Sequence, residues 1–461
     1  MRMSGIAAVG SIDAGNDFAE ALERFNVPGA VFARVEGKRQ DIITAGVLNL
    51  RTGVPVSYDS LFQIGSITKA YTATLVHQLA DEGKLDISDK LYIHLPRFAA
   101  VAGERYAEVT IRQLLNHTSG IDGDCFVDTG RGDECVGNFE NVAAKLFPLH
   151  QPAEMFSYCN TGYVLAGRIV EKITGQYWRD ALRMRILQPL DASRTLVLPE
   201  AVMRHSFAVG HQGGANGAGM QVIDPLLLPR SNEPAGSTPW SDMAGLLAFA
   251  RCHWAEGLCA HGNRLISKEA ARLMRRWDID CPSHEPFSAW GPGWALFDWE
   301  DRRFFGHDGL TRGQAAFLRI EPDTGLILAM FANGGDMRGL FMEMAGRALG
   351  KGSVFAPCHK FPPPSFDGSL EKYVGVYSKF SDALRLALRS EGLHLQVEPR
   401  NDPAGIVKPI SVMLQAISQT VFVGHITDVS TPVVLNFSSF DPDKRPQRVH
   451  MHLRAYGRDG L

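Results

Sequence analysis

The chain has 461 residues, of which 45% are hydrophobic and 21% charged, and its formal net charge at pH 7 is −3. This length and composition predict a globular protein of two or three domains, large enough to enclose a deep site. The nearly neutral charge, without a long run of Lys or Arg, argues against nucleic acid or an anionic membrane as a partner. A small molecule or a peptide fits better as the substrate, and a homo-oligomer stays open.

The N-terminus, residues 1–10, has too short an apolar core for a signal peptide, and no run of about 18 apolar residues occurs in the chain. We therefore expect a cytoplasmic protein without a membrane partner. The seven cysteines lack the Cys-x-x-Cys spacing of zinc sites, and no other metal-binding spacing occurs. The sequence accordingly predicts no metal and no cofactor. Cys125 and Cys135 bracket a polar stretch, and whether they pair is left open.

An antiparallel sheet is predicted to begin early, because residues 29–35 and 41–46 read as two strands joined by a short turn. An apolar stretch, residues 62–70, then passes into a helical pattern that continues to Leu79. Further on, Thr110 is expected to cap another short helix that ends near Leu115.

A serine and a lysine three residues apart, Ser66 and Lys69, stand where that first helix is expected to open. Positions i and i+3 share a helix face, so the Lys69 amine can reach the Ser66 hydroxyl as a proton acceptor. A lysine base must be neutral, and lowering its pKa from about 10.4 to near 7 takes roughly 4 kcal/mol. Only a desolvated, cation-rich site supplies that. Chance gives about two such pairs in a chain this long, and a second pair, Ser369 and Lys372, is expected to be solvated surface.

The middle of the chain, from about 160 to 275, has mainly helical periodicity and predicts a helical subdomain beside the sheet. Strand patterns then return at residues 293–297, 303–307, 314–320 and 326–332. A helical pattern follows at residues 337–349.

A proline-rich linker, residues 357–364, is predicted to separate a first domain, residues 1–356, from a second one, residues 365–461. The second domain has period-two patterns at 383–388, 393–397, 433–437 and 449–453, which favour a small antiparallel barrel.

Two further motifs carry polar side chains to the ends of expected elements. Tyr158 and Asn160 precede an amphipathic helix, where a turn can present both to a cleft, although a loop tyrosine and a capping asparagine are the commoner interpretation. His307 and Gly309 end an expected strand, and the glycine would let the backbone approach a ligand. His211, in a Gly-rich loop, is the weaker candidate for the same role.

Taken in order, Ser66-x-x-Lys69, Tyr158-x-Asn160 and His307-x-Gly309 resemble the serine beta-lactamase and penicillin-binding-protein-like hydrolases. The resemblance is nearest to class C beta-lactamases, D-aminopeptidases, DD-peptidases and family VIII-type esterases, and it covers roughly residues 20–350. It implies an α+β, beta-lactamase-like fold, in which an antiparallel sheet is flanked by helices and a helical subdomain. The C-terminal strands resemble the lipocalin-like barrel of some peptidase members, where that barrel borders the site.

The resemblance also implies a role for each motif residue. Ser66 would be acylated, while Lys69 and Tyr158 would share the general-base work and protonate the leaving group. Asn160 and His307-x-Gly309 would contact the substrate. The backbone N–H groups of Ser66 and Leu310 would form the oxyanion hole.

The expected function is therefore a serine hydrolase that cleaves amide bonds of small or linear peptides through an acyl-enzyme. A carboxylesterase with weak beta-lactamase activity is the alternative, and a non-catalytic binding or sensor protein is the third possibility. Class C beta-lactamases usually carry Lys-Thr-Gly where this chain has His307-Asp308-Gly309, which shifts the expectation away from beta-lactams.

Overall fold

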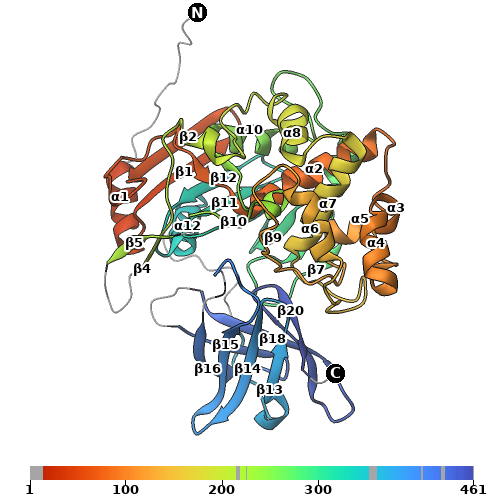
Figure 1. Cartoon of the computed structure of the whole chain (residues 1–461). Coiled ribbons are helices and arrows are strands. Elements are labelled where there is room, and N and C mark those ends of the chain that lie inside the picture. Colours follow the sequence, from red (N-terminus) through yellow and green to blue (C-terminus); the bar gives the residue numbers. More distant parts are fainter. Residues whose placement is uncertain are drawn as a thin grey trace, which may run out of the picture.

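The computed structural model describes residues 14–213, 219–224, 226–351, 361–405, 407, 409–426 and 431–459. An eight-stranded antiparallel sheet lies among helices, and a closed eight-stranded barrel lies below this larger domain in Figure 1. The α+β class and the C-terminal barrel expected from the sequence are both present.

The sheet has the strand order β2-β1-β12-β11-β10-β9-β8-β7, so the first hairpin of the chain is completed by strands from much later in the sequence. Val31, for example, lies opposite Thr44 of β2 on one side and opposite Phe331 of β12 on the other. The strands are β1 (Gly29–Glu36), β2 (Arg39–Gly46), β7 (Ile279–Asp280), β8 (Ala289–Trp290), β9 (Ala295–Trp299), β10 (Arg302–Leu310), β11 (Ala315–Ile320) and β12 (Ile327–Ala332). Two short pairs lie outside this sheet: β3 (Phe62–Gln63) with β6 (Trp240–Ser241), and β4 (His211–Gly213) with β5 (Met220–Val222).

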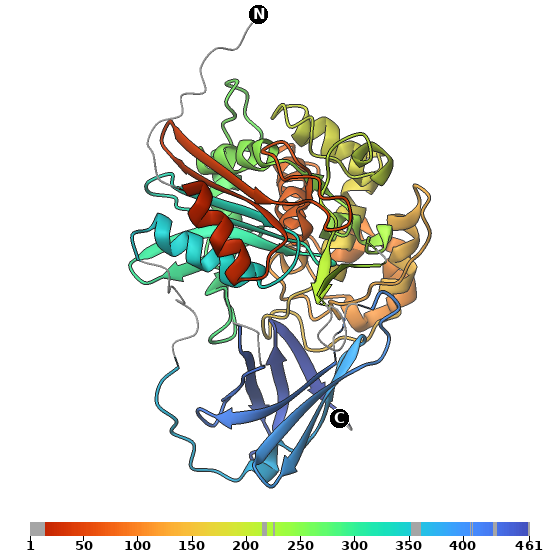
Figure 2. The same ribbon diagram turned by 90° about the vertical axis from the view of Figure 1, so that its left-hand side faces the viewer.

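Helices cover both faces of the sheet, which explains why β11 and β12 are buried along their whole length and apolar except for Arg319 of β11. Because side chains alternate along a strand, Phe32 packs into one core with α1 (Ala14–Arg24) and α12 (Met337–Ala348), while Val31 packs into the other. Figure 2 shows α1 and α12 side by side on their face of the sheet. The opposite core includes α2 (Thr68–Asp81).

The other helices form the helical subdomain and its connections. Thr110 caps α5 as predicted: its side chain accepts from Gln113 N, and the Gln113 side chain accepts from Thr110 N. These helices are α3 (Leu91–His94), α4 (Pro96–Ala102), α5 (Ile111–Leu115), α6 (Cys135–Ala143), α7 (Asn160–Thr174), α8 (Trp178–Leu182), α9 (Pro199–Val202), α10 (Met243–Trp254) and α11 (Lys268–Met274).

The barrel has its own hydrophobic core, to which Tyr377, Leu395 and Phe437 contribute. Its strands are β13 (Gly375–Ser378), β14 (Asp382–Arg389), β15 (Gly392–Pro399), β16 (Ile410–Ala416), β17 (Val421–Gly424), β18 (Val433–Phe440), β19 (Pro446–Met451) and β20 (Arg454–Arg458).

One strand ends earlier than its pattern predicts. The alternation over 449–453 reads as a continuous strand, but β19 stops at Met451 and the chain turns at His452 and Leu453, whose φ angles are 48° and 70°. Two positive φ values are typical of a type I′ hairpin turn, which normally uses Asn-Gly. A His-Leu pair in this conformation is strained, so contacts beyond the hairpin must hold it there.

Those contacts come from the larger domain, in the segment that carries Tyr158. Leu453 O accepts a hydrogen bond from Tyr158 N (2.9 Å), Ala455 N donates to Ser157 Oγ (3.1 Å), and His450 Nε2 bonds Phe156 O (2.7 Å). The β19–β20 hairpin is thereby hydrogen-bonded to the segment that leads into the predicted site.

The second Ser-x-x-Lys pair has a structural role. Ser369 caps the 3₁₀ turn η6 (Leu370–Tyr373), where its side chain accepts from Glu371 N.

Cys125 and Cys135 are both free thiols. Cys252 and Cys259 are also free thiols, and their sulfur atoms lie 3.1 Å apart. Cys358 lies outside the described residues. Within the described ranges, no helix is long and apolar enough to cross a membrane. The same part of the chain contains no cluster of three or more His, Cys, Asp or Glu that could hold a metal ion.

Candidate active site

Ser66 lies in a single 3₁₀ turn, η1 (Gly65–Ile67), that leads directly into α2. The end of β10 contacts this turn through backbone atoms. A Cβ atom placed on Gly309 would lie 1.9 Å from Ile64 O and 3.1 Å from Ser66 N, and one placed on Gly65 would lie 2.8 Å from Leu310 N. Glycine at position 309 is therefore required for this approach, which brings the backbone at the end of β10 against the backbone at Gly65 and Ser66.

Lys69 is fully buried and its amine makes three contacts. Nζ lies 2.9 Å from Ser66 Oγ, 2.6 Å from Asn160 Oδ1 and 2.7 Å from Ala235 O. The amide and peptide oxygens only accept, so each must receive an N–H. A neutral amine has two N–H groups, and after these two bonds its lone pair is left for Ser66. The three contacts match the three N–H groups of an ammonium, which would donate to Ser66 Oγ as well; in the neutral form the lone pair faces Ser66 Oγ instead.

The electrostatic surroundings favour that neutral form. Burial lowers the pKa of Lys69 well below its ordinary value, and the positive charge of Arg454 lowers it further, while Asp124 and Cys159 raise it. This is the desolvated, cation-rich environment that a lysine base requires.

Tyr158 packs beside Lys69 and keeps its proton. The amine lies 4.9 Å from the centre of the Tyr158 ring, and the guanidinium carbon of Arg454 lies 4.7 Å from it. Burial raises the pKa of Tyr158, partly offset by a hydrogen bond with Ser66 and by the charge of Arg454. The ring of His117 packs against the phenol, with 4.4 Å between ring centres and a tilt of 30°, and its Nδ1 accepts from Cys159 N (2.9 Å). The phenol is held in one place as a proton donor.

Asn160 is the first residue of α7, whose cap is Cys159: the sulfur accepts from Gly162 N. The capping interpretation of Asn160 therefore does not hold. Its amide nitrogen donates to Asp124 Oδ1 (2.9 Å) while its oxygen accepts from Lys69. Because a carboxylate only accepts, Asp124 fixes which end of the amide faces the lysine.

His307 is buried and neutral. Its Nδ1 bonds the backbone oxygen of Asp308 (2.6 Å), and its Nε2 has no hydrogen-bond partner among the described residues. Burial is the main cause that lowers the pKa of His307 to about 3. The Asp308 carboxylate pairs with Arg319 (2.6 Å) and Arg338 (2.8 Å) instead. It therefore does not hold a second proton on the His307 ring.

The competing histidine, His211, is occupied by the backbone. Its Nδ1 bonds Asn333 O (2.7 Å), and its Nε2 accepts from Leu50 N (3.2 Å). It lines the cavity but has no ring nitrogen left for a ligand.

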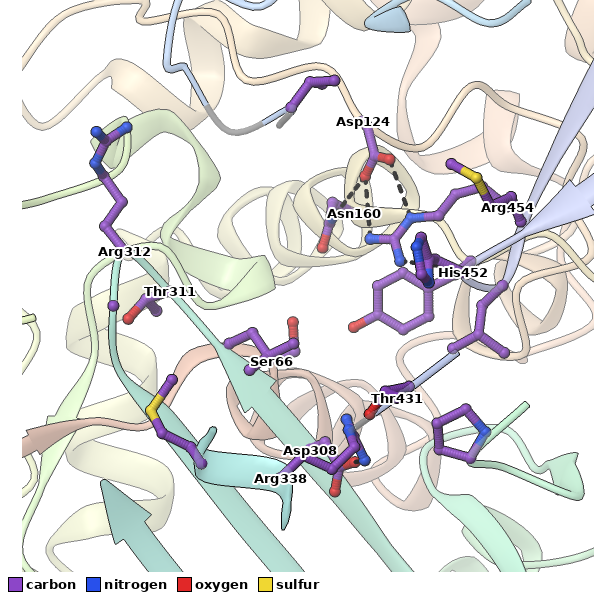
Figure 3. A pocket seen from close by; sticks show the side chains of 18 of the residues that line it. Ser66, Asp124, Asn160, Asp308, Thr311, Arg312, Arg338, Thr431, His452 and Arg454 are labelled. Carbon is purple, nitrogen blue, oxygen red and sulfur yellow. Dashed lines mark hydrogen bonds and ion pairs between the residues drawn. The ribbon is translucent and has the colours of Figure 1, made fainter. Parts of the chain in front are cut away.

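A cavity of about 1240 Å³ opens onto Ser66 and runs between the larger domain and the barrel. The structure brings the predicted residues Ser66, Tyr158, Asn160, His307 and Leu310 to its wall, with Lys69 beneath Ser66. In Figure 3, Ser66 lies between a group formed by Asp124, Asn160 and Arg454 and a second group with Asp308 and Arg338.

Two site residues could not be found from motifs. Asp124 lies in a loop whose acidic residues resemble surface charges, and Arg454 lies in the barrel, far from every motif in sequence. Only the contacts of Arg454 with the Tyr158 ring and with Asp124, and of Asp124 with Asn160, identify them.

Known proteins are similar in sequence to most of this chain. The family model described as Beta-lactamase matches residues 16–349. Penicillin-binding protein 4 of Amycolatopsis lactamdurans is 40% identical over 361 residues, which cover 76% of this chain and 94% of that protein.

Solved structures extend the likeness to the barrel. The crystal structure of SurE is 26% identical with a TM-score of 0.78, and SurE with D-Leu is 25% identical with a TM-score of 0.75; both alignments cover 97% of this chain and 98% of the other. A D-stereospecific amidohydrolase from Streptomyces sp. is 27% identical with a TM-score of 0.58, over 72% of this chain and 98% of its own.

Proposed function

This chain belongs to the beta-lactamase family of serine hydrolases, and on that premise we propose that it cleaves amide bonds of small or linear peptides through an acyl-enzyme on Ser66. The observation that carries the proposal is the arrangement around Lys69. Burial lowers the pKa of Lys69 well below its ordinary value, and in the neutral amine Asn160 Oδ1 and Ala235 O accept its two N–H groups while the lone pair faces Ser66 Oγ.

In the proposed reaction, Ser66 Oγ attacks the substrate carbonyl as its proton passes to Lys69. Negative charge develops on the carbonyl oxygen, beside the backbone N–H groups of Ser66 and Leu310. The C–N bond then breaks, and the leaving nitrogen takes up the proton through Tyr158, which is a phenol at the working pH because burial raises its pKa. Water subsequently hydrolyses the ester on Ser66.

The cavity wall supports a peptide substrate. Four polar side-chain atoms of residues that line it are buried without a hydrogen-bond partner among the described residues: Ser237 Oγ, His307 Nε2, Thr311 Oγ1 and Arg312 Nε. Unpaired buried polar atoms are costly, and the N–H and C=O groups of a bound peptide would pair them. The names of two relatives, SurE with D-Leu and the D-stereospecific amidohydrolase, support a D-configured residue on the acyl side.

A substrate panel tests the proposal: D- and L-aminoacyl p-nitroanilides, the matching p-nitrophenyl esters and a chromogenic cephalosporin. We expect turnover of the anilides, with kcat/KM for the D series at least tenfold above the L series. Turnover of esters without anilides would overturn the amidase proposal in favour of the carboxylesterase alternative.

The chain offers a matched control for the nucleophile. Ser66→Ala should abolish anilide turnover, whereas Ser369→Ala removes the serine of the second Ser-x-x-Lys pair. Because Ser369 only caps a 3₁₀ turn, its loss should cost about 1 kcal/mol of stability and leave turnover unchanged.

A further inference from the structure

The barrel brings two charged side chains, Arg454 and Lys379, to Asp124 in the acylation centre, and of these Arg454 also lies against the Tyr158 ring. Arg454 begins β20 directly after the strained His452-Leu453 turn. Its Nε donates to Asp124 Oδ2 (3.0 Å), a terminal nitrogen lies 3.4 Å from Asp124 Oδ1, and another donates to His452 O (2.8 Å). Figure 3 shows the guanidinium joined to Asp124 on the cavity wall.

Asp124 connects this arginine to the catalytic lysine. Besides Arg454, the carboxylate contacts the barrel residue Lys379 (3.0 Å) and accepts from Asn160 Nδ2 (2.9 Å). Asn160 in turn accepts from Lys69 Nζ at 2.6 Å. An unbroken path of three polar contacts therefore runs from the barrel to the amine: Arg454 to Asp124, Asp124 to Asn160, and Asn160 to Lys69.

We propose that Arg454 is a positioning residue of the acylation centre: supplied by the barrel, it fixes Asp124 and thereby the Asn160 amide that orients Lys69. The strained turn supports this assignment. Non-glycine residues with positive φ persist where surrounding contacts force them and are frequent at functional sites. Here the turn delivers both Arg454 and the Leu453 oxygen that accepts from Tyr158 N.

The charge of Arg454 also acts on the lysine. Burial is the main cause of the lowered pKa of Lys69, and Arg454 is the next, opposed by Asp124. The titratable or charged groups around the amine are Arg454, Asp124, Cys159, Tyr158, Tyr163, His117 and His307. Both histidines are neutral because burial lowers their pKa values, which leaves Arg454 and Asp124 as the charges that set the balance.

The inference rests on the proposed function, since it requires Lys69 to act as the base. Removing the arginine charge takes away a repulsion and leaves Asp124 less neutralised, so both effects raise the pKa of Lys69. The acylation rate falls at low pH as Lys69 takes up a proton, and we call this part of the pH profile the acidic limb. A higher pKa of Lys69 must move the acidic limb to higher pH. A purely structural arginine would lower the rate or the stability without moving that limb.

The test measures the second-order rate of inactivation by a fluorophosphonate between pH 5 and 10 in full-length variants. In Arg454→Gln we expect the acidic limb to move up by about one pH unit, which is about a tenfold slower reaction below the limb. Arg454→Lys keeps the charge and should keep the limb in place with a lower plateau, because lysine lacks the planar fork of donors. Asp124→Asn, which removes the opposing charge, should move the limb to lower pH.

Arg458→Gln is the matched control. This arginine lies on the same strand but bonds within the barrel, to Val374 O (2.6 Å) and Lys372 O (3.2 Å). Its replacement should leave the limb in place even if the melting temperature falls.

An unmoved limb in Arg454→Gln, or an equal displacement in Arg458→Gln, would overturn the inference while leaving the proposed function intact. A wild-type enzyme that no fluorophosphonate inactivates at any pH would overturn both.

Discussion

The hydroxyl of Tyr158 is the group through which the proposed centre delivers a proton. Tyr158→Phe keeps the ring between Lys69 and Arg454 and removes only the O–H, so packing is preserved. We expect kcat to fall by about 10²- to 10⁴-fold with little change in KM, because proton transfer is realised in the transition state. Steady-state kinetics on a D-aminoacyl p-nitroanilide measure the effect.

A second buried tyrosine provides the control for that variant. Tyr163 lies 5.7 Å from the Lys69 amine, but its hydroxyl donates to Leu115 O (2.7 Å). Tyr163→Phe should cost about 1 kcal/mol of stability and leave kcat within a few-fold of wild type. Equal losses of kcat in both variants would remove Tyr158 from the proton transfer.

At this scale, sequence reasoning finds residues whose spacing is fixed by local structure. Ser66 in η1 and Lys69 at the start of α2 are three residues apart, and Tyr158 and Asn160 flank a helix cap, so their motifs are visible in the chain. Asp124 and Arg454 meet only because two domains pack together, and no spacing rule links them. The sequence likewise gives no reason for Asn160 to bond Lys69 in the free enzyme. This bond follows from the contact with Asp124, which orients the Asn160 amide.

At the scale of helices and strands, the proposed oxyanion hole depends on the contact between the end of β10 and η1. Gly309→Ala would drive a methyl group into Ile64 O and push β10 away from Ser66 N. We expect kcat/KM to fall by about 10²- to 10³-fold, the usual effect of losing one oxyanion donor. Gly132→Ala, at a position where a Cβ meets nothing within 4 Å, is the control. Unchanged kcat/KM in folded Gly309→Ala would show that the approach of β10 is not needed for catalysis.

Strands and helices follow their sequence patterns except where tertiary contacts intervene. Largely apolar runs predict β11 and β12, and the Thr110 cap predicts α5, because both signals are carried by a few consecutive residues. The pattern over 449–453 misses the turn at His452, since His-Leu is not the Asn-Gly type of pair that marks such a turn in a sequence. Ser66 likewise lies in a 3₁₀ turn rather than in the first turn of α2, because β10 contacts its backbone.

At the scale of the whole molecule, sequence patterns cannot predict how the barrel packs against the larger domain. Buried charges concentrate at this junction: Asp122 Oδ2 accepts from Phe380 N (2.6 Å), and Lys379 pairs with both Asp124 and Asp382. Composition identifies a strand-rich C-terminal unit, but the match of these few side chains across the junction depends on the folded shapes of both partners.

This junction makes stability depend on pH. Burial raises the pKa of Asp122 to about 6, above the usual value near 4 in an unfolded chain. A carboxyl group whose pKa is higher in the folded protein contributes stability below about pH 4 and loses it as the pH rises through 6. A pKa difference of about 2 between the folded and unfolded chains corresponds to roughly 3 kcal/mol of folding free energy.

Asp122→Asn keeps an oxygen that accepts from Phe380 N but never ionises. Its melting temperature relative to wild type should therefore rise as pH increases from 4 to 7, as measured by scanning calorimetry. A difference between the two proteins that stays constant over this range would show that Asp122 does not titrate in the folded protein.

The formation of a covalent adduct on Ser66 tests the proposed mechanism most directly. The folded enzyme is treated with a fluorophosphonate and its peptides are mapped by mass spectrometry, with Ser66→Ala and Ser369→Ala in parallel. The geometry around Lys69 predicts a single label on the peptide that contains Ser66, lost in the first variant and kept in the second. A folded wild-type enzyme that takes up no label, or takes it up on another residue, would contradict the assignment of Ser66 as the nucleophile.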